Sequence, residues 1–152
     1  DSQFIKGINM NFCEGVSDTM LKGGGSRNWY QDYSPTLHSF SMNGRNLLRL
    51  SLSKLEIFTN NFFENMDIAI TDVDVIIPHQ ASKAGLNLFK KQNNLPNDRV
   101  KETLYKYGNC IAASIPLTMH DAIESGELKR GDTCWLIGTS AGFSIGSILI
   151  RY

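Results

Sequence analysis

A nearly continuous apolar run, Val73–Ile77, is followed directly by Pro78 and lies between two segments with helical periodicity. Such a run predicts a strand buried on both faces of a sheet, and Pro78 ends it because proline cannot donate a hydrogen bond to a neighbouring strand. Before it, apolar residues recur at three- and four-residue spacings, which predicts a helix capped by Ser41 and ending near Met66. After it, Ala81–Gln92 predicts a second helix. Helices on either side of a doubly buried strand indicate an α/β fold.

The remaining segments continue this alternation of strands and helices. Phe4–Phe12 is rich in β-forming residues and predicts a strand, whereas the glycine-rich Glu14–His38 that follows predicts a long loop. The later elements are expected to be a short helix, a longer helix, and two strands joined by a small-residue turn: Arg99–Tyr107, Ser114–Gly126, Thr133–Ile137, Ser144–Ile150 and the turn Gly138–Gly142. We therefore expect one layered domain over residues 1–152, with a mixed sheet packed against helices.

Composition excludes several classes of protein. The chain has 152 residues, 15 Lys and Arg against 15 Asp and Glu, and is 41% apolar, which is enough to bury a core. A net charge of zero gives no basic face for nucleic acid. Its apolar runs are far shorter than the roughly 18 residues of a membrane span, and its first residues do not resemble a signal peptide. We expect a soluble, cytoplasmic protein that binds neither nucleic acid nor membrane.

The cysteines do not form a pattern that indicates a disulfide scaffold or a metal site. Cys13, Cys110 and Cys134 are an odd number without paired spacing, and none belongs to a CxxC motif or lies near a pair of histidines. This pattern favours a reducing compartment, and we expect no bound metal.

Three places combine the end of a predicted strand or helix with polar residues. His79 follows the buried strand at its carboxyl end, where ligands gather in open α/β sheets, although it can equally cap the next helix. Asn109 follows Gly108 just before a helix and can aim an amide donor into a cleft, although Gly-Asn is also an ordinary turn. The Gly138–Gly142 turn allows backbone N–H groups to approach a ligand, as an oxyanion hole requires, although tight connections are common.

Cys110 offers a different chemistry at the second of these places. A helix N-terminus lowers the pKa of a thiol, so Cys110 and His79 together are compatible with a hydrolase if the thiol lies within about 3 Å of the imidazole. The small apolar residues that follow Cys110 favour a packing role instead.

Taken in order, these motifs resemble the C-terminal half of the β-ketoacyl-acyl-carrier-protein synthase III family, whose members are thiolase-fold condensing enzymes. The resemblance covers nearly the whole chain and rests on the order and spacing of its pieces. They are Phe40-Ser41-Met42-Asn43-Gly44, Asp74-Val75-Ile76-Ile77-Pro78-His79-Gln80-Ala81, Tyr107-Gly108-Asn109, Ala112-Ala113-Ser114-Ile115-Pro116, Lys129-Arg130-Gly131-Asp132 and Gly142-Phe143-Ser144-Ile145-Gly146-Ser147. The implied fold is a thiolase-like half.

The resemblance also implies a reaction and assigns roles in it. In this family a cysteine takes an acyl group from a coenzyme A thioester, and malonyl-acyl-carrier protein then loses carbon dioxide and attacks that acyl group. His79 matches the family histidine and Asn109 the family asparagine, two neutral donors that stabilise the enolate by about 3 kcal/mol for each well-aimed bond. The substrates are thioesters, and no further cofactor is implied.

The family cysteine belongs to an N-terminal half, and none of the three cysteines here matches it. We therefore expect this chain to be one half of a longer, dimeric enzyme and to lack condensing activity alone. The final turn, Ser140-Ala141-Gly142, departs from the glycine triplet of the family. The resemblance places Ala141, followed by Gly142, at the position whose backbone N–H serves the acyl oxyanion hole. Arg45, Arg49 and Lys83 are the expected contacts for the carrier protein or for coenzyme A, although Ala84 replaces a family arginine.

Two other interpretations of the resemblance remain open. One is a synthase III homologue that transfers acyl groups to another acceptor in secondary metabolism. The other is a non-catalytic subunit that binds carrier protein, although the presence of both His79 and Asn109 counts against it.

Overall fold

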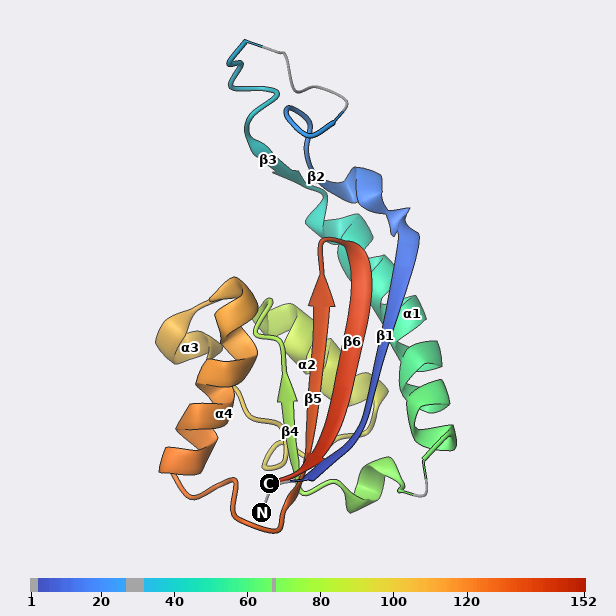
Figure 1. Ribbon diagram of the computed structural model, residues 1–152, viewed down its shortest axis with the longest axis vertical. Coiled ribbons are helices and arrows are strands. Elements are labelled where there is room, and N and C mark those ends of the chain that lie inside the picture. Colours follow the sequence, from blue (N-terminus) through green and yellow to red (C-terminus); the bar gives the residue numbers. More distant parts are fainter. Residues whose placement is uncertain (1–2, 27–31, 67) are drawn as a thin grey trace.

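A four-stranded mixed sheet forms the centre of the molecule (Figure 1), with its strands in the order β1-β6-β5-β4. The computed structural model describes residues 3–26, 32–66 and 68–152, with the backbone alone for 3–6 and 8–13. β4 runs parallel to β5, and β6 is antiparallel to both of its neighbours. The strands are β1 (Gln3–Gly15), β4 (Val75–Pro78), β5 (Thr133–Ser140) and β6 (Gly142–Arg151). The predicted buried strand, its end at Pro78 and the mixed sheet are confirmed.

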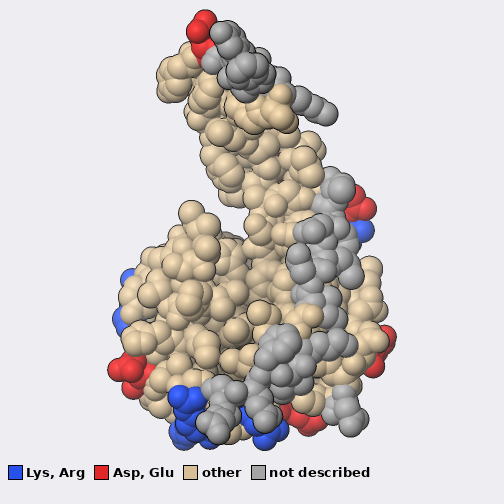
Figure 2. Space-filling view, in the orientation of Figure 1, with Lys and Arg blue, Asp and Glu red and all other residues tan. Residues whose placement is uncertain are grey.

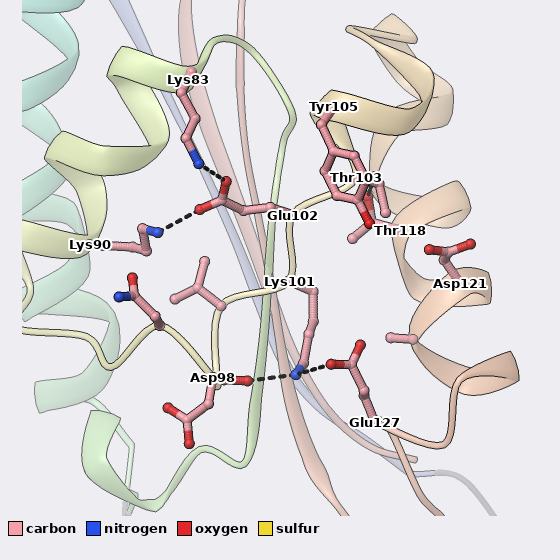
Figure 3. A pocket seen from close by; sticks show the side chains of 13 residues that line it. Lys83, Lys90, Asp98, Lys101, Glu102, Thr103, Tyr105, Thr118, Asp121 and Glu127 are labelled. Carbon is pink, nitrogen blue, oxygen red and sulfur yellow. Dashed lines mark hydrogen bonds and ion pairs between the residues drawn. The ribbon is translucent and has the colours of Figure 1, made fainter.

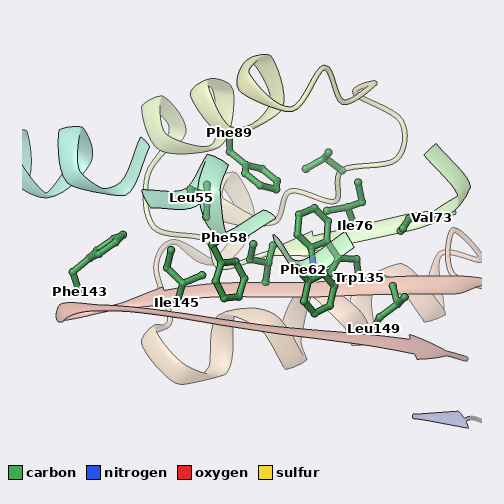
Figure 4. Close-up of a cluster of buried hydrophobic side chains, with 12 residues drawn as sticks. Leu55, Phe58, Phe62, Val73, Ile76, Phe89, Trp135, Phe143, Ile145 and Leu149 are labelled. Atoms are coloured by element: carbon green, nitrogen blue, oxygen red, sulfur yellow. The ribbon is translucent and has the colours of Figure 1, made fainter. Parts of the chain in front are cut away.

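Helices cover both faces of this sheet, as the layered α/β prediction requires. α1 (Gly44–Glu64) and α2 (Lys83–Gln92) pack on one face, and α4 (Ser114–Glu124) packs on the other. Because side chains alternate along a strand, Trp135 lies among the aromatic residues of α1 and α2 (Figure 4), whereas Cys134 faces α4. The buried cluster around Trp135 also includes Leu55, Phe58, Phe62, Phe89, Ile145 and Leu149. Among the described residues, no helix combines the length and the apolar character needed to cross a bilayer.

The predicted cap of α1 at Ser41 is wrong by two residues. Ser41 instead belongs to β3 (Phe40–Met42), where it pairs with Met20 of β2 (Thr19–Leu21). The cap is Asn43, whose Oδ1 accepts a hydrogen bond from the Asn46 backbone N–H at 3.2 Å. Both side chains are good caps, and the pairing with β2 decides between them.

The predicted loop Glu14–His38 is partly regular structure. β1 continues to Gly15, a 3₁₀ turn (Val16–Asp18) follows, and β2 then pairs with β3 to form a two-stranded arm that projects from one end of the sheet. Residues 27–31 of the predicted loop lie outside the described part. The arm leaves three large apolar side chains more than half exposed: Leu21, Phe40 and Met42. A two-stranded ribbon is marginally stable by itself, so the arm is suited to packing against something else.

The predicted helix over Arg99–Tyr107 is mostly wrong. Val100 pairs in parallel with Ile76 at the edge of the sheet, and only the last residues form a helix, α3 (Leu104–Tyr107). Two further 3₁₀ turns precede β4 and α4, η2 (Ile70–Asp72) and η3 (Ile111–Ala113). α4 begins at the predicted Ser114, with Pro116 in its first turn.

The connection between the last two strands is shorter than predicted. Gly138 pairs with Gly146, and the pairing continues to Ser140 and Ser144. Ala141 alone therefore lies between β5 and β6, and Gly142 adopts a left-handed φ of +74°.

Candidate functional site

His79 follows β4 directly, and its backbone N–H donates to Ile137 O of β5 at 2.8 Å. This bond continues the pairing of the two parallel strands and fixes the position of His79 at their carboxyl ends. Its side chain is half-buried, and this burial lowers the pKa of the imidazole below its usual value, so the ring is neutral at neutral pH. The imidazole forms no hydrogen bond with any residue that the structure describes. It is therefore a neutral ring available to a ligand.

Asn109 lies in the exposed loop between α3 and η3. Its Oδ1 accepts a hydrogen bond from the Ile111 N–H at 2.9 Å, so the amide oxygen is occupied and the Nδ2 donors point elsewhere. Within the described ranges, Nδ2 has no hydrogen-bond partner. Ile111 has a φ of +51°, a strained value for a β-branched residue, and the bond from Asn109 helps to hold it.

His79 and the loop that carries Asn109 lie at the same end of the sheet. The carboxyl end of β4, the start of α4 and the β5–β6 connection all meet there (Figure 1). A Cβ atom placed on Gly138 would lie 3.8 Å from His79 Cβ and 3.2 Å from Ile115 Cδ1. Gly138 thus lies between His79 and the first turn of α4. The sequence predicts Gly138 only as part of a turn, because its place opposite Gly146 depends on how the two strands pair.

The β5–β6 connection lies at this same end. Ala141 is exposed and is not among the described residues with positive φ, so its conformation does not require the family's glycine. Phe143, which follows Gly142, is 2% exposed and has a φ of +56°. Two of the three described non-glycine residues with positive φ therefore lie at this end of the sheet, Ile111 at the start of η3 and Phe143 at the start of β6.

The three predicted basic contacts lie on α1 and α2, which both begin at this end of the sheet. Arg45 and Arg49 are exposed, one turn apart, and neither has an ion-pair partner in the described part of the chain. Lys83 is also exposed but bonds Glu102 Oε2 at 2.7 Å. Of these three residues, only the two on α1 therefore present an unpaired positive charge.

Glu102 holds two lysines of α2 at once (Figure 3), because its other oxygen bonds Lys90 Nζ at 2.5 Å. Burial by itself would raise the pKa of Glu102, but the hydrogen bonds and charges of Lys83 and Lys90 together outweigh burial and lower the pKa. These residues line a surface cavity of about 420 Å³, whose lining includes neither His79 nor Asn109. Its lysines are paired with acidic partners, so the cavity presents little free positive charge.

An apolar hollow of about 510 Å³ lies on the sheet face beside α4. Gly138, which adjoins His79, is part of its lining, together with Ile115, Leu136, Gly146 and Ile148. Ile148 is 40% exposed, and among the described residues the centre of the view in Figure 2 shows no Lys, Arg, Asp or Glu. The hollow is therefore suited to an apolar covering segment.

The described cysteines do not supply a nucleophile beside His79. The Cys110 thiol donates to Tyr107 O at 3.3 Å, and within the described ranges no hydrogen bond joins it to His79. Burial, reinforced by the charge of Asp132, raises the pKa of the Cys134 thiol to about 12, so this thiol stays protonated. The side chain of Cys13 lies outside the described part. The hydrolase alternative thus lacks the contact on which it depends.

Comparison with known proteins gives a consistent result. Residues 63–152 match the sequence profile described as the C terminal of 3-oxoacyl-[acyl-carrier-protein] synthase III. Relatives named β-ketoacyl-[acyl-carrier-protein] synthase III include one from Aquifex aeolicus, 34% identical over 73% of this chain and 36% of its own length. Another, from Koribacter versatilis, is 32% identical over 91% of this chain and 43% of its own length. The chain thus spans less than half the length of these relatives.

Solved structures agree with this assignment. The crystal structure of the Aquifex aeolicus synthase III superposes with a TM-score of 0.80, at 28% identity, over 99% of this chain and 45% of that one. The Thermus thermophilus synthase III, at 22% identity, shares the fold with a TM-score of 0.85 over 98% of this chain and 46% of that one. The thiolase-like fold class is confirmed. The profile covers more than half of the chain, and the chain belongs to the 3-oxoacyl-[acyl-carrier-protein] synthase III family, as its C-terminal part.

Proposed function

We propose that this chain provides the enolate-stabilising half of a condensing enzyme that joins an acyl-coenzyme A to malonyl-acyl-carrier protein in fatty-acid or related biosynthesis. The observation that carries the proposal is the pair of unoccupied neutral donors, the His79 imidazole and the Asn109 Nδ2 group, at one end of the sheet in a chain of this family. Their presence argues against a subunit that only binds carrier protein, because binding alone has no use for them.

In the proposed reaction, the bond between the malonyl carboxylate and the α-carbon breaks and releases carbon dioxide. The electron pair of that bond moves into an enolate whose negative charge develops on the thioester oxygen. An N–H of His79 and one of Asn109 donate to that oxygen, each contributing about 3 kcal/mol when well aimed. The low pKa of His79 supports this role, since a neutral ring keeps its N–H without carrying a charge into a half-buried site.

The enolate carbon then attacks the carbonyl carbon of the acyl group held on a cysteine. This attack forms the new carbon–carbon bond and a tetrahedral oxyanion, which accepts hydrogen bonds from backbone N–H groups at Ala141 and Gly142. Its collapse re-forms the carbonyl, breaks the carbon–sulfur bond and releases the cysteine thiolate. The conformation of Ala141, outside the positive-φ region, supports a backbone donor there. Because the substrates are thioesters, the reaction needs no cofactor and no metal.

We further propose that the nucleophilic cysteine lies in a second half of the protein that covers the apolar hollow beside α4. Two observations support a covering segment. The relatives are more than twice as long as the part matched here, and the hollow adjoins His79 through Gly138. A covering segment would exclude water from the site and strengthen the two enolate bonds.

The proposed partners follow from the charges and apolar surfaces at this end of the molecule. Arg45 and Arg49 of α1, together with Lys83 of α2, suit an acidic carrier protein or the phosphates of coenzyme A. The exposed apolar residues of the arm suit an interface, and we propose that the complete enzyme is a cytoplasmic homodimer.

The test separates the two half-reactions in the full-length protein. His79→Ala and Asn109→Ala should each lower the rate of malonyl-thioester decarboxylation by roughly 100- to 1,000-fold, because each removes one donor to the enolate oxygen. Acylation of the cysteine by acyl-coenzyme A should change little. His120→Ala, which removes an exposed histidine of α4, is the matched control. Decarboxylation at the wild-type rate in either site variant, or an equal loss of acylation, would refute the assignment.

A further inference from the structure

Gln80, the residue after His79, is buried to 1% exposure and uses every hydrogen-bonding position of its amide. Its Nε2 donates to Pro78 O at 2.8 Å and to Lys101 O at 3.2 Å. Its Oε1 accepts from the Thr103 N–H at 3.0 Å and the Leu104 N–H at 3.1 Å. Glutamine is rarely fully buried, and here its side chain joins the end of β4 to the start of α3.

The chain of buried hydrogen bonds continues from Thr103 to α4. Thr118 donates its single hydroxyl proton to Ser114 O at 2.8 Å, so in the contact between Thr103 and Thr118, at 2.5 Å, Thr103 is the donor. Figure 3 shows these two threonines side by side. Thr103 is 5% exposed, and Thr118 and Ser114 are 0% and 2% exposed. The hydroxyl of Ser114 in turn accepts the Cys110 N–H at 3.1 Å.

This network begins beside His79 and ends beside Asn109. We propose that Gln80 is a positioning residue that, through Thr103, Thr118 and Ser114, sets the place of the Asn109 amide relative to the His79 imidazole. The inference rests on the proposed function, since it assumes that the two donors act on one oxygen. Buried polar groups with all partners satisfied allow few alternative arrangements, which is what two donors aimed at one atom require.

The central experiment compares Gln80→Met with a matched Gln92→Met control in the full-length protein. Methionine keeps the length of the side chain but leaves the N–H groups of Thr103 and Leu104 without their acceptor. Gln92 also donates to a backbone carbonyl, Leu52 O at 2.8 Å, but joins α2 to α1. Gln80→Met should lower decarboxylation roughly 10- to 100-fold while acylation stays within about twofold, because displacing a donor by about 1 Å has that effect. Gln92→Met should leave the ratio of the two rates unchanged.

A second arm distinguishes positioning from general destabilisation. In an Asn109→Ala background there is no amide left to position, so Gln80→Met should change the remaining decarboxylation less than about threefold. An equal fall of both half-reactions, or a full additional loss in that background, would overturn the proposal.

If Gln80→Met does not fold, Thr118→Val tests the proposed network instead, because valine keeps the shape of the side chain and removes only the hydroxyl. It should lower decarboxylation several-fold with acylation intact, and should accelerate amide hydrogen exchange at Cys110. An unchanged rate ratio together with unchanged exchange would refute the network.

If His79→Ala and Asn109→Ala decarboxylate normally, the proposed function fails. If they do not but Gln80→Met and Thr118→Val keep the wild-type ratio, this inference alone fails.

Discussion

The half-buried position of His79 links the chemistry of one side chain to the stability of the chain. Burial lowers the pKa of the imidazole in the folded state, whereas in the unfolded chain it titrates near its usual value of about 6.5. Between these two pKa values the unfolded state binds more protons, so the free energy of unfolding rises with pH. The contribution of the neutral His79 imidazole to stability is fully present above its pKa in the unfolded state. It is lost as the pH falls below that value towards the lower pKa of the folded state.

We therefore expect the wild-type chain to lose more stability between pH 7 and pH 5 than a His79→Gln variant, whose side chain does not titrate. The difference in slope is at most about 1.4 kcal/mol per pH unit for one proton. Denaturant unfolding of both proteins at a series of pH values measures it. Parallel pH profiles for wild type and His79→Gln would show that burial does not shift this pKa.

At the scale of single residues, the sequence indicates which residue types are functional but not what surrounds them in the fold. His79 and Asn109 were identified from their positions after a strand and before a helix. Gln80 was not, because glutamine is usually exposed and three of its four backbone partners lie 21 to 24 residues away in the chain. No local pattern reports such contacts.

At the scale of elements, the end of β1 packs closely against the start of β6. A Cβ atom on Gly15 would lie 2.7 Å from Phe143 Cβ and 3.2 Å from Leu50 Cδ2. Phe143 is buried in the positive-φ region and has little freedom to move away. Gly15→Ala should therefore lower the free energy of unfolding by about 1–3 kcal/mol through overpacking.

The matched control is Gly44→Ala at the first position of α1, where the nearest atom to a new Cβ is Met42 Cε at 3.9 Å. Alanine is the better helix former, so this variant should be as stable as the wild type or more stable. Thermal or denaturant unfolding of both variants measures the contrast. If Gly15→Ala matched the stability of Gly44→Ala, the close contact with Phe143 would be disproved.

Prediction of elements succeeded where a buried face imposed a clear period and failed where pairing between distant segments decided the structure. The buried strand β4 and the helices α2 and α4 follow from apolar spacing and end signals. Ser41 was expected to cap α1 but forms β3, and Val100 was expected in a helix but lies at the sheet edge beside Ile76. Both errors come from strand pairing, which local propensity does not report.

At the scale of the whole molecule, the chain leaves apolar surface open where its proposed chemistry takes place. The hollow beside α4 adjoins Gly138, and the arm exposes Leu21, Phe40 and Met42. In such an open site water competes for the enolate oxygen and weakens each donated hydrogen bond. Neither of the two described cysteine side chains is an activated thiol, since Cys134 stays protonated and the Cys110 thiol is bonded to Tyr107 O.

We therefore expect the polypeptide Asp1–Tyr152 by itself to form no 3-oxoacyl product from acyl-coenzyme A and malonyl-carrier protein. The assay compares it with the full-length protein at equal concentration, after near-ultraviolet circular dichroism has shown that buried Trp135 lies in a fixed environment. The physical reason is that an enolate formed here has no acyl-cysteine to attack, so His79 and Asn109 have no condensation to complete. Measurable turnover by the folded chain alone would mean that its own residues supply the nucleophile, and the division of the reaction between two halves would have to be abandoned.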